Sequence, residues 1–177
     1  WTVFALFSDN EHAPAHQLTE YLGEVAGILF FLMGAMTIVE LIDAHDGFEV
    51  ITSRIRTTNK RKLIWVIGLI TFFLSAVLDN LTTTIVLVSL LRIIIPDKKD
   101  RLLFAGMVII SANAGGAWSP IGDVTTTMLW IGGQITAGNI IIKTLLPSLV
   151  CFLVPAIIIS RQLKGHIGQS VEPIKNK

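Results

Sequence analysis

Two short polar stretches interrupt apolar runs of this chain, and each contains an aspartate together with asparagine and threonine. The first is L-D-N-L-T-T-T at residues 78–84, and the second is A-N-A-G-G-A-W-S-P-I-G-D-V-T-T-T at residues 112–127. Carboxylate, amide and hydroxyl oxygens are ligands of hard cations, and neither stretch offers a thiol or an imidazole. The two stretches therefore predict an oxygen-lined cation site.

Proton chemistry follows from the two aspartates. Burial away from water favours the neutral form of a carboxylate, so one carboxylate holds either a proton or a cation near neutral pH, but not both. That competition is the minimal mechanism of cation/proton antiport, with Asp79 and Asp123 as the exchanging groups. The predicted ligands of the cation are Asp79, Asn80, Thr82, Thr83, Asn113, Asp123, Thr125 and Thr126, with Thr84 and Thr127 beside them.

The composition predicts an all-α integral membrane protein around these stretches. Apolar residues make up 52% of the chain and charged residues 15%, whereas charge is about a quarter in soluble domains. The mean hydropathy is +0.68. The one cysteine, Cys151, leaves no disulfide framework. Without Cys, His or phosphate-loop motifs, we expect no soluble enzyme, nucleotide-driven pump, cofactor or nucleic-acid partner.

We expect one partial transmembrane domain over residues 1–177. The W-T-V-F-A-L-F at its start is too short to cross a membrane and is interpreted as the remnant of a helix, so we expect a fragment. T-A-G-N at 136–139 is expected to form a turn. The predicted segments are crossings at 22–42 and 140–160, an interfacial amphipathic helix at 46–62, a re-entrant hairpin at 63–95, a broken crossing at 102–135 and a cytoplasmic tail or linker at 161–177.

Length predicts the hairpin. As one helix, Leu63–Ile95 would be about 50 Å long, against a hydrocarbon core of about 30 Å. Its apolar arms, 63–78 and 85–95, would be about 24 and 17 Å long as helices, each too short to cross. Two short arms that meet at a polar tip are typical of a re-entrant hairpin.

The basic residues test that topology independently. Of the fourteen Lys and Arg, five lie in 54–62, three in 98–101 and four in 161–177. Under the positive-inside rule all three groups face the cytoplasm. Both ends of 63–95 then lie on one side, so the segment must enter the membrane and return.

Glycine and proline predict the break in the second long run. Gly115, Gly116, Pro120 and Gly122 favour unwinding, because glycine is permissive and proline lacks an N–H donor. Unwound backbone at membrane depth occurs where it is buried in protein or lines an aqueous cavity. Secondary transporters build ion sites from such broken helices.

The motifs resemble those of a known family. F-F-L-S-A-V-L-D-N-L-T-T-T and S-A-N-A-G-G-A-W-S-P-I-G-D-V-T-T are similar to the NhaD type of sodium/proton antiporter, as is G-A-M-T-I-V-E-L-I-D-A-H-D-G-F in the first crossing. The resemblance covers residues 23–160. It implies a secondary transporter, not an enzyme, that exchanges Na⁺ or Li⁺ for H⁺, built from two inverted repeats and forming a homodimer in the lipid bilayer. The same superfamily contains arsenite permeases and divalent-anion/sodium symporters.

Position by position, the resemblance favours a cation. Asp79 and Asn80 match the polar pair at the hairpin tip, where the symporters carry Ser-Asn-Thr. Asp123-Val124-Thr125-Thr126 stands where anion transporters tend to show Pro-Pro-Asn. One hairpin and one broken helix imply one repeat, with the C-terminal repeat missing. The expected location is the bacterial inner membrane, with the chloroplast envelope as an alternative.

Other interpretations stay open. Three other classes of protein each fit part of the pattern: an anion or arsenite permease of the same superfamily, an intramembrane aspartyl protease using Asp79 and Asp123, and a non-transporting membrane subunit. The threonines could be interhelical hydrogen-bond partners, Ser75 a helix-packing serine, and the two aspartates a structural pair neutralised by Arg92. Solvated charges at the interface explain Glu40 and Asp43 as well as a functional role does.

Overall fold

The computed structural model describes residues 13–45, 47 and 57–167. Its regular structure in that part consists of α-helices and an isolated β-bridge between Asn59 and His166, which agrees with the expected all-α class. The chain divides into two compact units, residues 1–38 and 39–177, and each is described by itself. Of the predicted interfacial helix at 46–62 and the tail at 161–177, residues 46, 48–56 and 168–177 lie outside the described part.

Helix α2, Ala13–Ala44, contains the predicted crossing at 22–42 and begins earlier. Its stretch Leu18–Ile42 has 25 residues with a mean hydropathy of 2.3, long and apolar enough to cross a membrane. Large apolar side chains such as Leu29 and Phe30 are exposed within this chain. A helix that is apolar on all sides is suited to lipid or to the interior of a large membrane protein.

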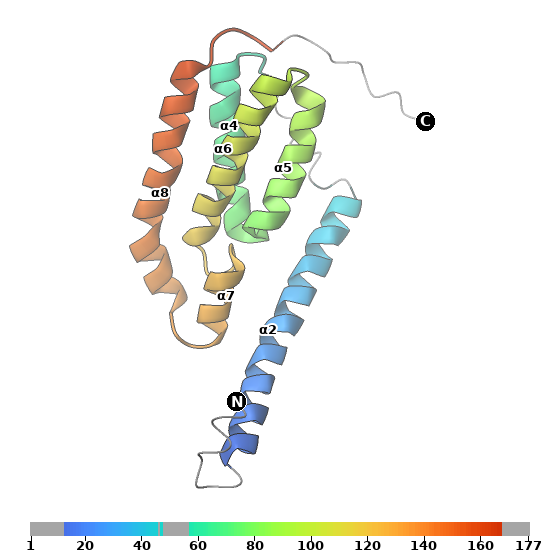
Figure 1. Ribbon diagram of the computed structural model, residues 1–177, viewed down its shortest axis with the longest axis vertical. Coiled ribbons are helices and arrows are strands. Elements are labelled where there is room, and N and C mark those ends of the chain that lie inside the picture. The colour runs from blue at the N-terminus through green and yellow to red at the C-terminus, as the bar shows by residue number, and fades with distance from the viewer. Residues whose placement is uncertain (1–12, 46, 48–56, 168–177) are drawn as a thin grey trace. The chain divides into compact units, whose positions relative to one another are not determined.

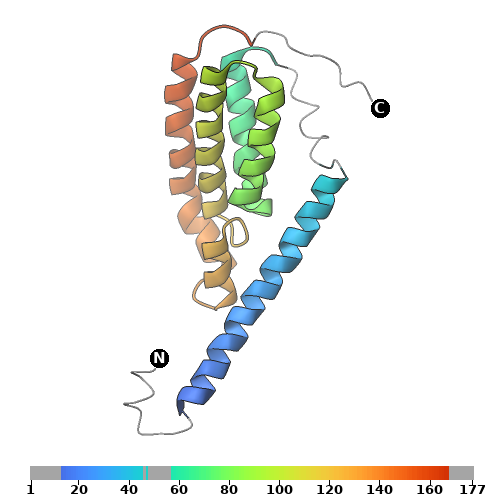
Figure 2. The same cartoon turned by 45° about the vertical axis from the view of Figure 1, so that its right-hand side comes forward.

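The second unit is a bundle of helices. It consists of α4 (Lys60–Leu78), α5 (Asn80–Ile94), α6 (Lys98–Ala117), the short α7 (Val124–Ile131) and α8 (Ala137–Gln162). Helix α4 packs against α5, α6 and α8, and α6 also packs against α5 and α8. Figures 1 and 2 show these four helices side by side, with α7 following the lower end of α6.

Aromatic packing centres on Phe72 of α4, which is fully buried. Its ring centroid lies 5.3 Å from that of Phe152 on α8 and 6.2 Å from that of Trp118, which follows α6. The buried cluster adds aliphatic residues from α4, α5 and α6, among them Ile67, Leu87 and Val108. One apolar core therefore fixes α4 relative to its neighbours.

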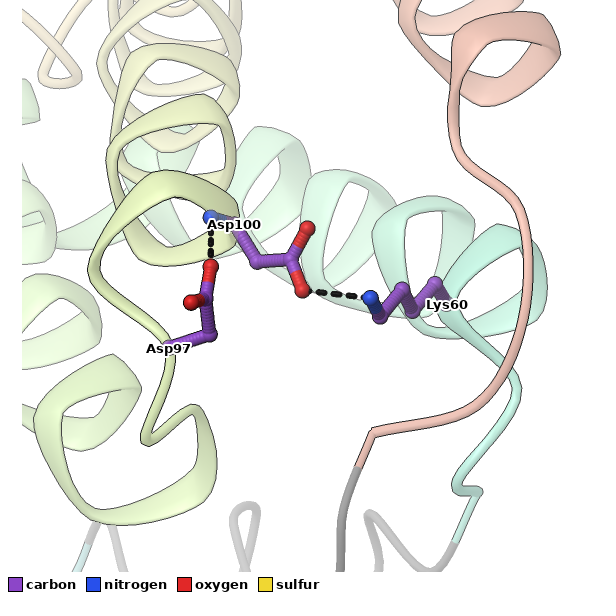
Figure 3. A network of polar contacts seen from close by, with 3 residues as sticks. All are labelled: Lys60, Asp97 and Asp100. Carbon is purple, nitrogen blue, oxygen red and sulfur yellow. Dashed lines mark hydrogen bonds and ion pairs between the residues drawn. The ribbon is translucent and has the colours of Figure 1, made fainter.

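The helix ends that carry basic residues gather at one end of the bundle. There α4 and α6 begin and α5 and α8 end (Figure 1). Lys60 pairs with Asp100 at 2.5 Å, and Asp97 accepts a hydrogen bond from the Asp100 backbone N–H at 2.9 Å (Figure 3). The guanidinium Nε of Arg61 donates to the carbonyl of Leu163 at 2.9 Å. Residues 63–95 thus start and finish at the same end of the bundle.

The hairpin differs from the prediction in the extent of its arms. Helix α5 begins at Asn80, so the residues expected at a polar tip are helical and Asp79 alone separates the arms. Helix α4 has 19 residues and a mean hydropathy of 1.8, enough to cross a membrane. The prediction that both arms are too short to cross is therefore wrong for α4; α5, with 15 residues, would be about 22 Å long.

The second long run breaks as expected, but at a different place. Helix α6 continues to Ala117, so Gly115 and Gly116 are helical, and the chain unwinds only from Trp118 to Asp123 around Pro120. Helix α8 covers the predicted crossing at 140–160. The expected turn at 136–139 is wrong: Thr136 caps α8, whose first turn follows, and the chain turns at 132–135 instead.

Candidate functional site

The hairpin tip consists of one residue, Asp79, in an unusual conformation. Its φ of 93° and ψ of 157° lie in a region that residues other than glycine rarely adopt. Its Oδ1 accepts hydrogen bonds from the backbone N–H groups of Leu81 at 2.7 Å and Thr82 at 2.9 Å. Its Oδ2 accepts one from the Thr82 hydroxyl at 2.7 Å. The carboxylate therefore caps α5 and satisfies amides that have no partner within the helix.

Asp123 plays the same local part at the break. Its Oδ1 accepts from the backbone N–H of Thr125 at 2.8 Å and also from the Thr125 hydroxyl. The carboxylate thus caps α7, as Asp79 caps α5. Both polar stretches of the sequence place an aspartate at the start of a helix that follows an interruption.

Close backbone approach fixes the hairpin to the broken helix. A Cβ added at Gly115 would lie 2.1 Å from the Phe72 carbonyl oxygen, and one at Gly122 would lie 2.7 Å from that of Ser75. The Ser75 hydroxyl, fully buried, donates to the carbonyl of Ala112 at 2.6 Å. Ser75 is therefore a helix-packing serine, and the glycines allow α4 to lie against α6 and the break.

Asn80 joins the two polar stretches. Its amide Nδ2 donates to Asn113 Oδ1 at 3.1 Å and to Asp123 Oδ2 at 2.6 Å. The Asn113 amide also donates to the carbonyl of Ile109 at 2.8 Å, which fixes its orientation. We refer to Asn80, Asn113, Asp123 and Thr125 as the Asn80 cluster. It brings together four of the predicted ligands, from α5, α6 and the start of α7.

Of the remaining predicted ligands, Asp79, Thr82 and Thr126 have local partners, and Thr83 has none within the described part of the chain. Thr82 bonds to Asp79, and the Thr126 hydroxyl donates to the carbonyls of Ser119 and Asp123, both at 2.9 Å. The Thr83 hydroxyl is fully buried and finds no partner within the described part of the chain. Thr84 and Thr127 donate to carbonyls four residues back, of Asn80 and Asp123. The contact of Thr126 with Ser119 was not predicted, because its acceptor is a backbone carbonyl, which every residue type has.

Exposure and charge distinguish the cluster from a structural ion pair. Asn113 and Thr125 are exposed within this chain, whereas Asp79, Asn80 and Asp123 are half-buried. Arg92 lies in the last turn of α5, about 20 Å along the helix from Asp79, too far to neutralise it. Among the described residues no three His, Cys, Asp or Glu side chains gather as they would around a transition metal.

Comparisons with known proteins add to this geometry. The family model described as CitMHS, citrate transporter, matches residues 13–174. Over 174 residues the chain is 53% identical to sodium/proton antiporter 2 of Arabidopsis thaliana, covering 98% of this chain and 41% of that protein. It is 50% identical to sodium/proton antiporter 1 of the same plant over 160 residues, 90% of this chain and 28% of that protein.

A bacterial relative is more distant. The chain is 32% identical to the Na⁺/H⁺ antiporter NhaD of Vibrio cholerae over 165 residues, 92% of this chain and 34% of that protein. The chain thus spans 28 to 41% of the length of these three relatives. No solved structure gave a match.

Proposed function

The chain belongs to the citrate transporter family, CitMHS, and we propose that the whole protein exchanges Na⁺, or Li⁺, for H⁺ across a membrane. One observation carries the proposal: the Asn80 amide lies between Asn113 Oδ1 and Asp123 Oδ2, where the hairpin tip meets the broken helix. The relatives named sodium/proton antiporters support the same activity.

The charge of the cluster favours a cation over an anion such as citrate. Asp123 supplies a carboxylate, and Asp79 precedes Asn80 in the chain. Among the described residues no Lys or Arg donates a hydrogen bond to the Asn80 cluster. An anion at membrane depth would be repelled by these carboxylates, and the repulsion grows as the dielectric constant falls.

The Asn80 amide suggests how a cation is bound. In the arrangement observed, the partly positive N–H₂ group lies between two oxygens, where a cation would be attracted. Rotation of the amide by half a turn would place Asn80 Oδ1 beside Asn113 Oδ1 and Asp123 Oδ2. Three oxygens would then converge, a set that suits a hard cation. A cation held by these three oxygens would replace the attraction that the N–H₂ group supplies to Asn113 and Asp123.

Exchange follows from the charge on Asp123. A bound Na⁺ neutralises the carboxylate, and a proton does the same when the Na⁺ leaves. Because the two compete for one carboxylate, a proton bound from one side releases the Na⁺, and a Na⁺ bound from the other side releases the proton. Thr125 holds the second carboxylate oxygen and so keeps Oδ2 directed at Asn80.

The remaining parts of the proposal concern the whole protein. The α4–α5 hairpin is re-entrant, its basic end faces the cytoplasmic side, and a second repeat outside this chain completes the site. The transporter forms a homodimer. Higher identity to the plant proteins than to NhaD favours a plant membrane, such as the chloroplast envelope, over the bacterial inner membrane.

Exchange in everted vesicles tests the function. Full-length protein is expressed in cells that lack their own sodium/proton antiporters, and collapse of a respiratory ΔpH is followed on addition of NaCl, LiCl or choline citrate. We expect Na⁺ to collapse the gradient with wild type and Asp123→Asn and Asp79→Asn to show only background. Asp97→Asn is the matched control, because Asp97 also caps a helix but at the opposite end of the bundle.

Two results would overturn the proposal. Full exchange by Asp123→Asn would remove that carboxylate from the mechanism. A response to choline citrate, without a response to Na⁺, would make the protein an anion transporter.

A further inference from the structure

The unwound segment between α6 and α7, residues 118–123, folds back on the end of α6. A Cβ added at Gly122 would lie 2.8 Å from the Cα of Gly116, so the two backbones are in close contact. The backbone N–H of Ser119 donates to the carbonyl of Gly116 at 3.3 Å. The segment is therefore a compact loop, and Asp123 stands at its end, where it caps α7.

The hydroxyl of Thr126, in the first turn of α7, joins the two ends of this loop. Its Oγ1 lies 2.9 Å from the carbonyl oxygen of Ser119 and 2.9 Å from that of Asp123. A hydroxyl has one proton to donate, and a carbonyl oxygen has two lone pairs. The carbonyl of Asp123 already accepts from the backbone N–H of Thr127 at 3.0 Å and from the Thr127 hydroxyl at 2.9 Å. The Thr126 proton is therefore assigned to the carbonyl of Ser119.

The Ser119 carbonyl depends on that proton. Ser119 is buried, with 5% of its surface exposed. Within the described part of the chain, the Thr126 hydroxyl is the hydrogen-bond donor to this carbonyl. A buried acceptor that loses its donor costs free energy, because water does not take the donor's place. Removal of the Thr126 hydroxyl would therefore drive the loop to rearrange until its backbone is satisfied.

Two consecutive threonines hold Asp123 in different ways. The backbone N–H of Thr125 donates to Asp123 Oδ1, so Thr125 holds the carboxylate itself. The Thr126 hydroxyl bonds to backbone carbonyls, and among the described residues it makes no hydrogen bond to a side chain of the Asn80 cluster. Thr126 therefore acts on the loop that leads to the carboxylate, whereas Thr125 acts on the carboxylate.

We propose that Thr126 is a positioning residue for exchange, because its hydroxyl closes the loop and so keeps Asp123 Oδ2 at 2.6 Å from the Asn80 amide. The inference rests on the proposed function and gives Thr126 a different part from the ligand role that the sequence predicted. A carboxylate displaced from Asn80 would bind Na⁺ less tightly, while the groups that serve the later steps are unchanged. The variant therefore loses affinity rather than maximal rate.

Four variants of the full-length protein test this role. Thr126→Val keeps the shape of the side chain without the donor, and Thr126→Ser keeps the donor. Ser119→Ala leaves the Thr126 hydroxyl intact but removes the oxygen that accepts the backbone N–H of Ile121 at 3.3 Å, and so loosens the same loop from its other side. Thr144→Val is the matched control, because the partly buried Thr144 hydroxyl also donates to a carbonyl, that of Ile140, within α8.

Two measurements are made on each variant. The KM for Na⁺ and the maximal rate are determined from the collapse of ΔpH in everted vesicles. The order of the loop is measured separately, by hydrogen–deuterium exchange of peptides that cover residues 116–127 in the purified protein. We expect Thr126→Val to raise the KM about 10- to 100-fold, as is typical when a residue that holds a ligand in place is removed, with a maximal rate near that of wild type and faster deuterium uptake in the loop.

Ser119→Ala should change the KM and the deuterium uptake in the same direction, and Thr126→Ser and Thr144→Val should behave as wild type. A wild-type KM in Thr126→Val would overturn the proposal. A raised KM in Thr126→Val with a wild-type KM in Ser119→Ala would do so too, since the hydroxyl would then be a direct ligand. Absence of Na⁺ exchange in wild type would overturn the proposed function and the role in exchange together, whereas unchanged deuterium uptake in Thr126→Val would overturn the closing of the loop whatever ion is transported.

Discussion

Replacing Asp79 with glycine separates the structural role of this residue from its proposed role in exchange. Among the described residues, Asp79 is the only one other than glycine with a positive φ. Its φ of 93° and ψ of 157° lie in a region that is essentially confined to glycine, and such a conformation costs of order 1–3 kcal/mol. Glycine would adopt it without that cost.

The interactions of the Asp79 carboxylate that the variant loses oppose this gain in stability. Glycine at a helix cap is only a few tenths of a kcal/mol worse than aspartate. The variant also loses the bond from the Thr82 hydroxyl, worth about 0.5–1.5 kcal/mol. Together these terms place Asp79→Gly between about 1 kcal/mol less stable and about 2 kcal/mol more stable than wild type, with the middle of the range on the stabilising side. If Asp79 were only structural, glycine would be an adequate replacement.

We expect Asp79→Gly to keep or raise the melting temperature of the full-length protein while Na⁺-dependent collapse of ΔpH in vesicles falls to background. Asp97→Gly is the matched control, because Asp97 caps α6 with an ordinary φ of −69° and offers no strain to relieve. It should lose a little stability and keep exchange. Wild-type exchange by Asp79→Gly would refute the role of this carboxylate. A larger loss of stability than in Asp97→Gly would refute the strain argument.

Two further predictions concern the packing of the hairpin against α6 and the membrane topology of the hairpin. Gly115→Ala should lower the stability of the protein by about 1–3 kcal/mol and reduce exchange, because the new Cβ would lie 2.1 Å from the Phe72 carbonyl oxygen. Gly106→Ala is the control, since Gly106 lies on the same helix with open space around it, and it should be neutral or stabilising. Equal behaviour of the two variants would contradict the close approach. Single cysteines at Lys62 and Lys99, both exposed, in protein with Cys151→Ser, should be modified by an impermeant maleimide from one side of the membrane, whereas labelling from opposite sides would rule out the re-entrant hairpin.

Much of the fold could be predicted because membrane proteins separate apolar and basic residues along the chain. The apolar runs gave the helices at 22–42 and 140–160, and three basic groups gave a common end for α4, α5, α6 and α8. These properties depend on local composition, so no tertiary information was needed. Pro120 likewise predicted the break, because proline removes a backbone donor wherever the chain packs.

The errors arose where tertiary contacts decide the outcome. Gly115 indicates unwinding in isolation, yet it is helical because the missing Cβ allows α6 to lie against Phe72. The residues after Asp79 have the composition of a loop, yet α5 starts at Asn80 because the Asp79 carboxylate caps its first amides. The threonines posed a third problem, since residue type does not reveal whether a hydroxyl faces an ion or a carbonyl of its own helix.

Under the proposed exchange, the contacts of the two aspartates predict unequal parts for them. Both oxygens of Asp79 accept bonds from Leu81 and Thr82 in its own helix. Asp123 uses one oxygen for Thr125 and offers the other to Asn80, on a different element. A proton or cation on Asp123 therefore changes a contact between the hairpin and the broken helix, whereas one on Asp79 changes the cap of α5. If exchange moves these elements relative to one another, binding of a proton or cation to Asp123 would alter the hydrogen bond between Asp123 and Asn80. The change at the broken helix would then reach the hairpin through the Asn80 amide.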